Sequence, residues 1–131
     1  MEKTRNKKCL RIKGRGWQEM DNIKLGRIGE ETAAEILRSK GFQILQKNYK
    51  CSMGEVDIIA AKGSLISFIE VKTRQSRAYG RPCESVGKDK QKHIKNAAVC
   101  YLKEMEKKGY VPGRVSFDVM EITAEHITAA F

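Results

Sequence analysis

The stretch GEVDIIAAKGSLISFIEVKTR, residues 54–74, reads as a β-hairpin whose two strands carry charged residues inside apolar runs. Gly63 and Ser64 predict a two-residue loop of type II′, the turn that takes glycine at its first position. A two-residue loop fixes the register of the strands, so Lys62 faces Leu65 and every further pair follows. This hairpin is therefore the segment from which the rest of the fold can be worked out.

Four charged residues fall together in the predicted register. Asp57 faces Glu70, Glu55 faces Lys72, and the alternation of side chains puts all four on one face. Like charges directly opposed across two strands are destabilising, so Asp57 and Glu70 predict either a shared proton or a bound divalent cation. The alternative is a solvated hairpin end, in which Glu55 and Lys72 form an ordinary surface ion pair of little energetic weight.

The opposite face of the hairpin is apolar. It carries Val56, Ile58, Ala60, Ile69 and Val71. The charged face also becomes apolar toward the loop, and strands that are apolar on both faces are typical of the centre of a covered sheet. We therefore expect the hairpin to be central.

The rest of the chain supplies two helices and two more strands. Apolar residues at helical spacing predict a first helix at about residues 24–40 and a second that starts near Ser85 and stops before Gly109. Alternating patterns predict strands in FQILQKNYK, residues 42–50, and RVSFDVMEIT, residues 114–123. The order is αβββαβ, which predicts an α/β domain with a small mixed central sheet flanked by helices.

The length of 131 residues suits a single domain. We expect residues 1–22 to form a basic, flexible N-terminal arm and residues 23–131 to form the domain. No apolar run approaches the roughly 20 residues needed to cross a bilayer, and no secretory signal follows the basic N-terminus, so we expect a cytoplasmic protein. The cysteines and histidines match no zinc spacing, so we expect reduced thiols and no zinc.

Positive charge is concentrated in one segment. The chain has 26 Lys and Arg residues against 16 Asp and Glu, a net charge of +10. Such an excess favours a polyanionic partner, either a nucleic acid or an anionic membrane surface. The sequence offers little apolar surface to anchor the protein in a membrane, so nucleic acid is the favoured partner. Within residues 23–131 the whole excess falls in residues 72–95. The basic residues of this segment are Lys72, Arg74, Arg77, Arg81, Lys88, Lys90, Lys92 and Lys95.

GEVDIIA, followed by FIEVKTR and preceded by GEE on the first helix, resembles the D…ExK signature of the PD-(D/E)XK nuclease superfamily. In closer detail the chain resembles the YraN family of small bacterial proteins, which are related in pattern to archaeal Holliday junction resolvases. The matching segments, which cover nearly everything from Leu25 to Ile122, are GRIGEETAAEIL, ILQKNYKCSMGEVDIIA, ISFIEVKTR, YGRPCESVGKDKQKHIKNAAVCYL and RVSFDVMEI. One departure is Val56, which stands where the superfamily's name has proline.

The resemblance implies a restriction-endonuclease-like fold with a metal-dependent catalytic site. It implies that Asp57 and Glu70 bind Mg²⁺ or Mn²⁺ and that Lys72 is the catalytic lysine. Glu30 would be a further catalytic acid beside the site, although a solvated helix glutamate is an equal alternative. Glu55 is a candidate supporting residue.

Other residues keep two interpretations. Gln91 shares the inward face of the second helix, so it either reaches the site in a supporting role or is a boundary residue of the helix. Asp118 either supports the site from the last strand or is exposed at an edge.

The GRIG sequence matches the GxxG of RNA-binding KH domains, but there the motif joins two helices. We therefore interpret Gly26 and Gly29 as positions of close packing.

The basic segment is expected to follow the phosphate backbone of a nucleic acid. Arg74, Arg77 and Arg81 should lie near the scissile phosphate. The second helix should extend the patch through Lys88, Lys90, Lys92 and Lys95.

These features predict a metal-dependent endonuclease that acts on structured or branched DNA, including RNA-containing forms. We expect Mg²⁺ or Mn²⁺ as the cofactor and no nucleotide cofactor. Symmetric cutting of a junction requires two sites and hence a homodimer. The alternative is a non-catalytic DNA- or RNA-binding protein that retains the nuclease fold.

Overall fold

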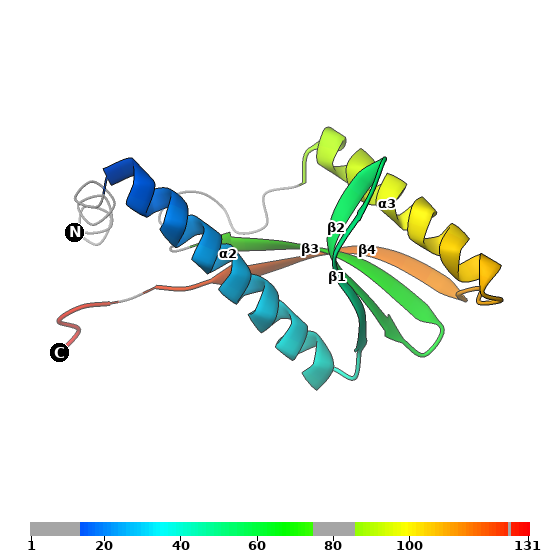
Figure 1. The fold of residues 1–131 in the computed structure, drawn as a ribbon. Helices are drawn as coiled ribbons and strands as arrows, with labels where there is room; N and C mark the ends of the chain where they lie inside the picture. Colours follow the sequence, from blue (N-terminus) through cyan, green and yellow to red (C-terminus); the bar gives the residue numbers. More distant parts are fainter. Residues whose placement is uncertain (1–13, 75–85, 126) are drawn as a thin grey trace.

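The computed structural model describes residues 14–74, 86–125 and 127–131, with side chains from Asn22 onward. Its elements follow the predicted αβββαβ order, which confirms the α/β class (Figure 1). The elements are α2 (Gly14–Ser39), β1 (Gln43–Cys51), β2 (Gly54–Lys62), β3 (Leu65–Arg74), α3 (Lys88–Lys107) and β4 (Arg114–Thr123).

The first helix, α2, begins earlier than predicted. It starts at Gly14 rather than near residue 24, so residues 14–22 of the expected arm are helical, and no proline interrupts them. The preceding residues 1–13 lie outside the described part of the chain. No helix in the described part is long and apolar enough to cross a membrane.

The end of α2 is set by a glycine. Gly41 has a φ of 90°, and the N–H of Phe42 donates to the Leu37 carbonyl at 3.0 Å while that of Gly41 donates to the Arg38 carbonyl. These two bonds form a Schellman motif, which satisfies carbonyls that the helix leaves unpaired. The chain can therefore reverse within a few residues and enter β1.

The four strands form one mixed sheet in the order β1-β2-β3-β4. β2 pairs antiparallel with both β1 and β3, whereas β3 and β4 run parallel. A parallel pair needs a crossover connection, and α3 lies in that connection. The sheet is therefore central and mixed, as predicted, and β4 is an edge strand.

The β2–β3 loop has the predicted geometry. Gly63 has a φ of 58° and Ser64 does not have a positive φ, as a type II′ turn requires. Lys62 pairs with Leu65, and the ladder continues to Ile58 and its partner on β3. The predicted register is confirmed over these pairs.

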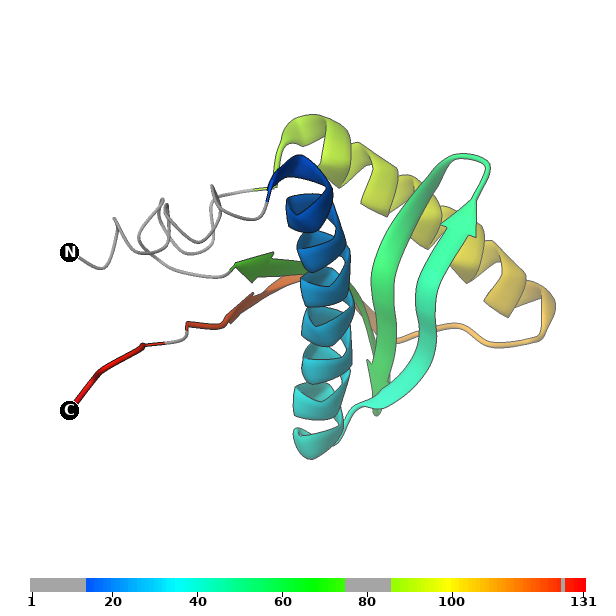
Figure 2. The same ribbon diagram turned by 60° about the vertical axis from the view of Figure 1, so that its left-hand side comes forward.

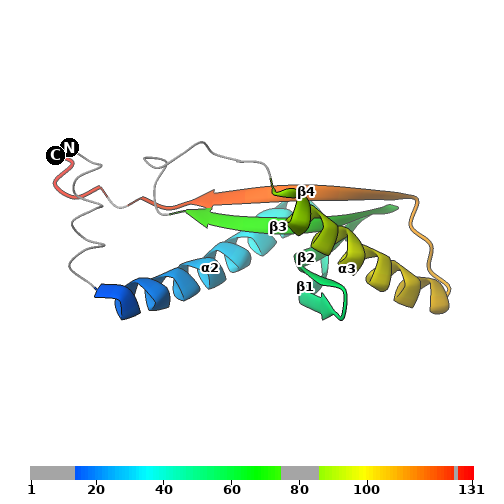
Figure 3. The same cartoon turned by 90° about the horizontal axis from the view of Figure 1, so that it is seen from above.

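The two helices cover opposite faces of the sheet. Ile69 of β3 is buried against Leu37 of α2, whereas Phe68 is buried against Tyr101 of α3, with 6.2 Å between the ring centroids. Successive residues of a strand point to opposite faces, so each helix covers one of them. Figure 3 shows α2 and α3 on either side of the β1–β2 hairpin.

Val56 does not lie on the predicted face. It is buried with Tyr49 in the core under α3, whereas Ile58 is buried under α2. The residue before Tyr49 is Asn48, whose φ of 51° is a left-handed conformation that asparagine tolerates better than most residues. Asn48 lies between the residues that pair with Ile58 and Val56, which is also where β2 leaves β3.

Two glycines bring the helices close to the sheet. A Cβ atom on Gly54 would lie 2.0 Å from the carbonyl oxygen of His93, so glycine lets β2 approach α3. A Cβ atom on Gly29 would lie 1.9 Å from Thr73 Oγ1, so α2 rests directly on the end of β3. Among the described residues, nothing lies within 4 Å of such an atom on Gly26. The prediction of close packing is therefore confirmed for Gly29 and wrong for Gly26.

Gly29→Ala and Gly26→Ala should change stability in opposite directions. The methyl group at position 29 overlaps Thr73, which should cost about 1–3 kcal/mol of unfolding free energy. At position 26 alanine should add up to about 1 kcal/mol, because it favours the helix and meets no neighbour. Urea unfolding measures both changes, and adding Thr73→Ala should recover part of the loss in Gly29→Ala. Equal effects of the two single variants would contradict the described contact of α2 with β3.

Candidate active site

The β2–β3 ladder ends just before the two acidic residues. Its last pair is Ile58 with Ile69, whereas β2 continues to pair with β1 as far as Gly54. The β1–β2 hairpin therefore diverges from β3 at Asp57 and Glu70. Figure 2 shows the hairpin rising away from the other two strands. Beyond this point the backbone groups of β3 that would pair with β2 can form hydrogen bonds with side chains instead.

A backbone hydrogen bond fixes Asp57. The N–H of Val71 donates to Asp57 Oδ2 at 2.8 Å, so the carboxylate takes the place of a strand carbonyl. The Glu70 carboxyl is a close neighbour, because the charge of Asp57 adds to the effect of burial in raising the pKa of Glu70. The structure thus brings Asp57 and Glu70 together, as the register predicts, although the regular ladder stops one pair earlier.

Burial perturbs both members of this acid pair, Asp57 and Glu70. Only 9% of Glu70 is exposed, and burial raises the pKa of its carboxyl, as does the neighbouring charge of Asp57. Burial also raises the pKa of Asp57, against the opposing effect of the Val71 N–H. Glu70 Oε2 is buried and has no hydrogen-bond partner in the part of the chain that the structure describes. Two desolvated carboxylates with an unsatisfied oxygen are costly unless a proton or a cation joins them.

Lys90, in the first turn of α3, supplies positive charge to the acid pair. Its Nζ lies 3.6 Å from Glu70 Oε1 and 3.6 Å from Glu55 Oε1. Against the effect of burial, its charge lowers the pKa of both Asp57 and Glu70. The sequence predicts phosphate binding for Lys90, whereas the structure turns its ammonium toward the carboxylates. The point at which α3 crosses β2 decides this orientation, and no sequence pattern gives that point.

Glu55 does not face Lys72, so that prediction is wrong. β2 has already left β3 at Glu55, because the ladder between them ends at Ile58. Glu55 instead forms ion pairs with Lys90 and, at 3.9 Å, with Lys50 of β1. Glu55 thus contacts β1 and α3 instead of forming the surface ion pair with Lys72 that the alternative interpretation proposed.

Lys72 lies beside Glu70, and a further acid stands next to both on β4. Against the effect of burial, the charge of Lys72 lowers the pKa of Glu70. The parallel register pairs Lys72 with Glu121, whose side chain is only 7% exposed. Arg74 Nε lies 2.6 Å from Glu121 Oε1, so Arg74 is held in an ion pair on the sheet. No tight turn sets the register of β4. The sequence therefore does not identify Glu121 as the cross-strand neighbour of Lys72.

The other predicted phosphate-binding residues are spread along α3 and the segment before it. Lys88, Lys92 and Lys95 are exposed on α3. Arg77 and Arg81 lie outside the described residues.

Glu30 stands apart from the acid pair. It is partly buried on α2, directly after Gly29, which packs on the end of β3. Within the described part of the chain, no hydrogen bond or ion pair joins Glu30 to Asp57 or Glu70.

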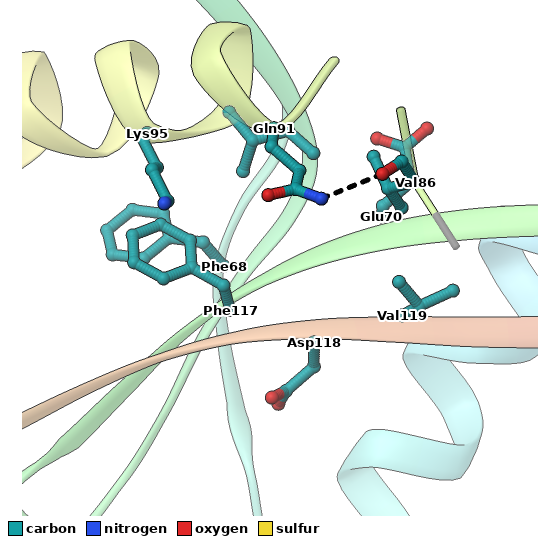
Figure 4. Close-up of a pocket in the computed structure, with 9 residues that line it drawn as sticks. Phe68, Glu70, Val86, Gln91, Lys95, Phe117, Asp118 and Val119 are labelled. Carbon is teal, nitrogen blue, oxygen red and sulfur yellow. Dashed lines mark hydrogen bonds between the residues drawn. The ribbon is translucent and has the colours of Figure 1, made fainter. Parts of the chain in front are cut away.

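Gln91 and Asp118 have different relations to the site. Gln91 Nε2 donates to the Val86 carbonyl at 2.8 Å, so it is a boundary residue of α3 that also lines a pocket with Glu70 (Figure 4). Asp118 also lines this pocket, but its carboxylate points away from it in Figure 4 and accepts a hydrogen bond from Ser67 on the other side of the sheet. Asp118 therefore does not support the acid pair.

The acid pair suits a hard divalent cation in an open site. Among the described residues, no three His, Cys, Asp or Glu side chains are arranged to hold a metal ion. Mg²⁺ is commonly bound through one or two carboxylates, with water and substrate phosphate completing its coordination. Asp57 and Glu70, with the unpartnered Oε2, fit that chemistry.

The mixed sheet and the αβββαβ order define a restriction-endonuclease-like domain. A family model described as "Uncharacterised protein family UPF0102" matches residues 29–122. The chain belongs to this family, which is the YraN family.

Relatives from several bacteria support the assignment. A UPF0102 protein of Dictyoglomus turgidum is 44% identical over 103 residues, which cover 79% of this chain and 85% of the relative. One from Caldicellulosiruptor saccharolyticus is 42% identical with the same coverage. One from Clostridium perfringens strain SM101 is 48% identical over 77% of this chain and 80% of its own length. Their names state no activity, so the function has to be argued from the site.

Glu70→Gln should stabilise the protein at neutral pH. Burial raises the pKa of Glu70 in the folded protein above its value in the unfolded chain, so the folded state binds this proton more tightly. The contribution of Glu70 to stability therefore falls as the pH rises from 4.5 through the folded pKa, and it stays low above that pKa. We expect Glu70→Gln to raise Tm by a few degrees at pH 8, and the gain should shrink toward pH 4.

Glu35→Gln is the matched control, because Glu35 is an exposed helix residue whose ion pair with Arg38 has little energetic weight. Its Tm should hardly change at either pH. A loss of stability in Glu70→Gln at pH 8 would show that the ion pair with Lys90 outweighs the burial of the carboxylate.

Proposed function

We propose that this protein is a metal-dependent endonuclease that hydrolyses phosphodiester bonds of structured or branched DNA. The observation that carries the proposal is the pairing of a half-buried Asp57 with a buried Glu70, whose Oε2 has no hydrogen-bond partner among the described residues and which has Lys72 beside it. Two carboxylates would repel the phosphates of a nucleic acid that is only bound. Together with a divalent cation they instead favour cleavage.

Asp57 and Glu70 would hold Mg²⁺ or Mn²⁺, which supplies an acidified water and neutralises charge at the phosphate. The Val71 N–H keeps the Asp57 carboxylate in place before substrate arrives. Lys72 would orient the attacking water and stabilise the negative charge that develops on the phosphate oxygens. Glu30 is the further acid of this proposal, and it would act through a water or a second ion because it does not touch the pair.

The basic residues of α3 would hold the DNA backbone. Lys88, Lys92 and Lys95 are exposed along the helix that begins at the acid pair, so their charges can follow phosphates leading from the site. Binding of this kind weakens steeply with salt and carries little sequence information. Symmetric cutting of a four-way junction would require a homodimer.

The alternative function is a non-catalytic DNA- or RNA-binding protein. One observation favours it specifically. Lys90 already places a positive charge against Glu70, so the acid pair has a resident counter-ion even without a metal. In that case the pair would be a structural feature beneath a basic surface.

Cleavage assays on labelled linear, flapped and four-way DNA with Mg²⁺ or Mn²⁺ distinguish the two functions. We expect Asp57→Asn, Glu70→Gln and Lys72→Met each to reduce the cleavage rate at least 100-fold, because each removes a charge at the reacting phosphate. Glu30→Gln in the same assay tests the further acid. Lys103→Met, on the exposed far end of α3, is the control and should cleave normally. If the wild type binds DNA but shows no metal-dependent cleavage, the endonuclease proposal is contradicted and the non-catalytic binding function remains.

Lys90→Met should increase the affinity for Mn²⁺. The ammonium of Lys90 competes with a divalent cation for the charge of Glu70, so its removal should tighten binding about 10-fold. Titration calorimetry with the free protein measures this without DNA or cleavage. Lys92→Met, two positions along the same helix and exposed, should bind Mn²⁺ as the wild type does. Equal affinities in the two variants would mean that Lys90 and the metal occupy different places.

A further inference from the structure

A pocket of about 240 Å³ adjoins the acid pair on the α3 side of the sheet (Figure 4). One wall is formed by Phe68 and Phe117, whose rings stack with centroids 5.7 Å apart and planes inclined by 26°. Val86 and Ile94 add apolar surface, and Glu70 also lines the pocket. An apolar space therefore opens directly beside the candidate catalytic residues.

Phe117 presents an aromatic ring to solvent at this pocket. It is 48% exposed, because β4 is an edge strand and α3 packs mainly over the other strands. Val115 and Val119, two positions to either side on β4, are each 40% exposed, so the ring belongs to a group of exposed apolar residues, and such groups mark binding sites. The ring therefore offers a flat, accessible face next to the acid pair.

The polar groups around the pocket are suited to a nucleotide. Gln91 uses its amide N–H to bind the Val86 carbonyl, and Figure 4 shows its amide oxygen on the side that faces the two phenylalanine rings. Lys95 lines the same pocket, and its ammonium points toward the side of the two rings in Figure 4. An acceptor and a cation thus border an aromatic wall, which matches a base with a phosphate attached.

We propose that this pocket binds one unpaired nucleobase of the substrate, next to the phosphate on which the acid pair acts. The proposal rests on the proposed function and narrows its substrate to DNA with unpaired nucleotides. The base would stack on Phe117, the Gln91 oxygen would accept a hydrogen bond from a base N–H, and Lys95 would contact the adjoining phosphate. Stacking on an aromatic side chain accepts any base, so little sequence preference follows.

The volume and the chemistry both favour a single base. Pockets for drug-sized ligands hold about 300–1,000 Å³, so a space smaller than these suits one flat ring system. A base within a duplex is paired and stacked, so its extraction into a pocket carries an energetic cost. Flaps, gaps and junction centres already hold unpaired bases. Such a base can enter the pocket without that cost.

A second copy of this chain is the competing occupant. An edge strand with exposed Val115 and Phe117 is also typical of an interface between copies. The exposed lysines of α3 argue against it, because two copies would bring two sets of like charges to one interface. The same lysines attract a polyanion.

The test compares binding of flapped and fully paired DNA by the full chain in EDTA, which prevents metal-dependent cleavage. Fluorescence anisotropy gives both affinities, and 2-aminopurine at successive flap positions reports stacking through quenching. Phe117→Ala should weaken flap binding about 5- to 150-fold and leave duplex binding nearly unchanged. The quenching at one flap position should be lost. Phe117→Leu, which keeps the apolar packing but has no flat ring, should behave in the same way.

Val115→Ala is the matched control, since Val115 lies on β4 with 40% exposure and does not line the pocket. It should bind both DNAs as the wild type does. Equal losses for flap and duplex in the Phe117 variants, or unchanged flap binding, would overturn the base pocket. A change in sedimentation caused by Phe117→Ala would assign the surface to a second copy instead. Absence of cleavage by the wild type would contradict the proposed nuclease and leave this binding result standing.

Discussion

The separation of β2 from β3 after the Ile58–Ile69 pair is the constraint on which the site depends. If the ladder continued, Asp57 and Glu70 would be ordinary cross-strand neighbours in a regular sheet. Because it stops, the Asp57 carboxylate can accept the Val71 N–H, and α3 can approach β2 closely at Gly54. The left-handed Asn48 lies where the strand pair turns away, so the separation is built into the backbone.

The site gathers several carboxylates in a partly buried place, where burial disfavours their charged form. Glu55, Asp57 and Glu70 lie near one another, and burial raises the pKa of the last two. In the structure Lys90 meets part of this charge from α3. Proteins retain such unfavourable clusters where function requires them, commonly at some loss of stability. The proposed divalent cation and the resident lysine are two ways to balance the same carboxylates.

The parts of the fold governed by local rules could be predicted from the sequence. Gly63 and Ser64 set the hairpin register, and with it the meeting of Asp57 and Glu70. The alternation in β1 and β4 and the apolar stripe of α3 located those elements to within a few residues. Each of these inferences needs only neighbours in the chain or one tight turn.

The rest depends on contacts between distant segments. Lys90 reaches the acids because of the place where α3 crosses β2, and Glu121 lies beside Lys72 because of the parallel register of β4. No loop length fixes either of these. Val56 lies in the core under α3, beyond the point where β2 leaves β3, and the alternating pattern does not reveal that separation. Such positions follow from packing rather than from periodicity.

The central claim is that the acid pair is a cation site whose place Lys90 partly fills. Anomalous diffraction from crystals soaked in Mn²⁺ tests it directly. The account predicts one manganese peak between Asp57 and Glu70, with the Lys90 ammonium moved away from Glu70. No peak at the pair under saturating Mn²⁺, with Lys90 still 3.6 Å from Glu70, would contradict it.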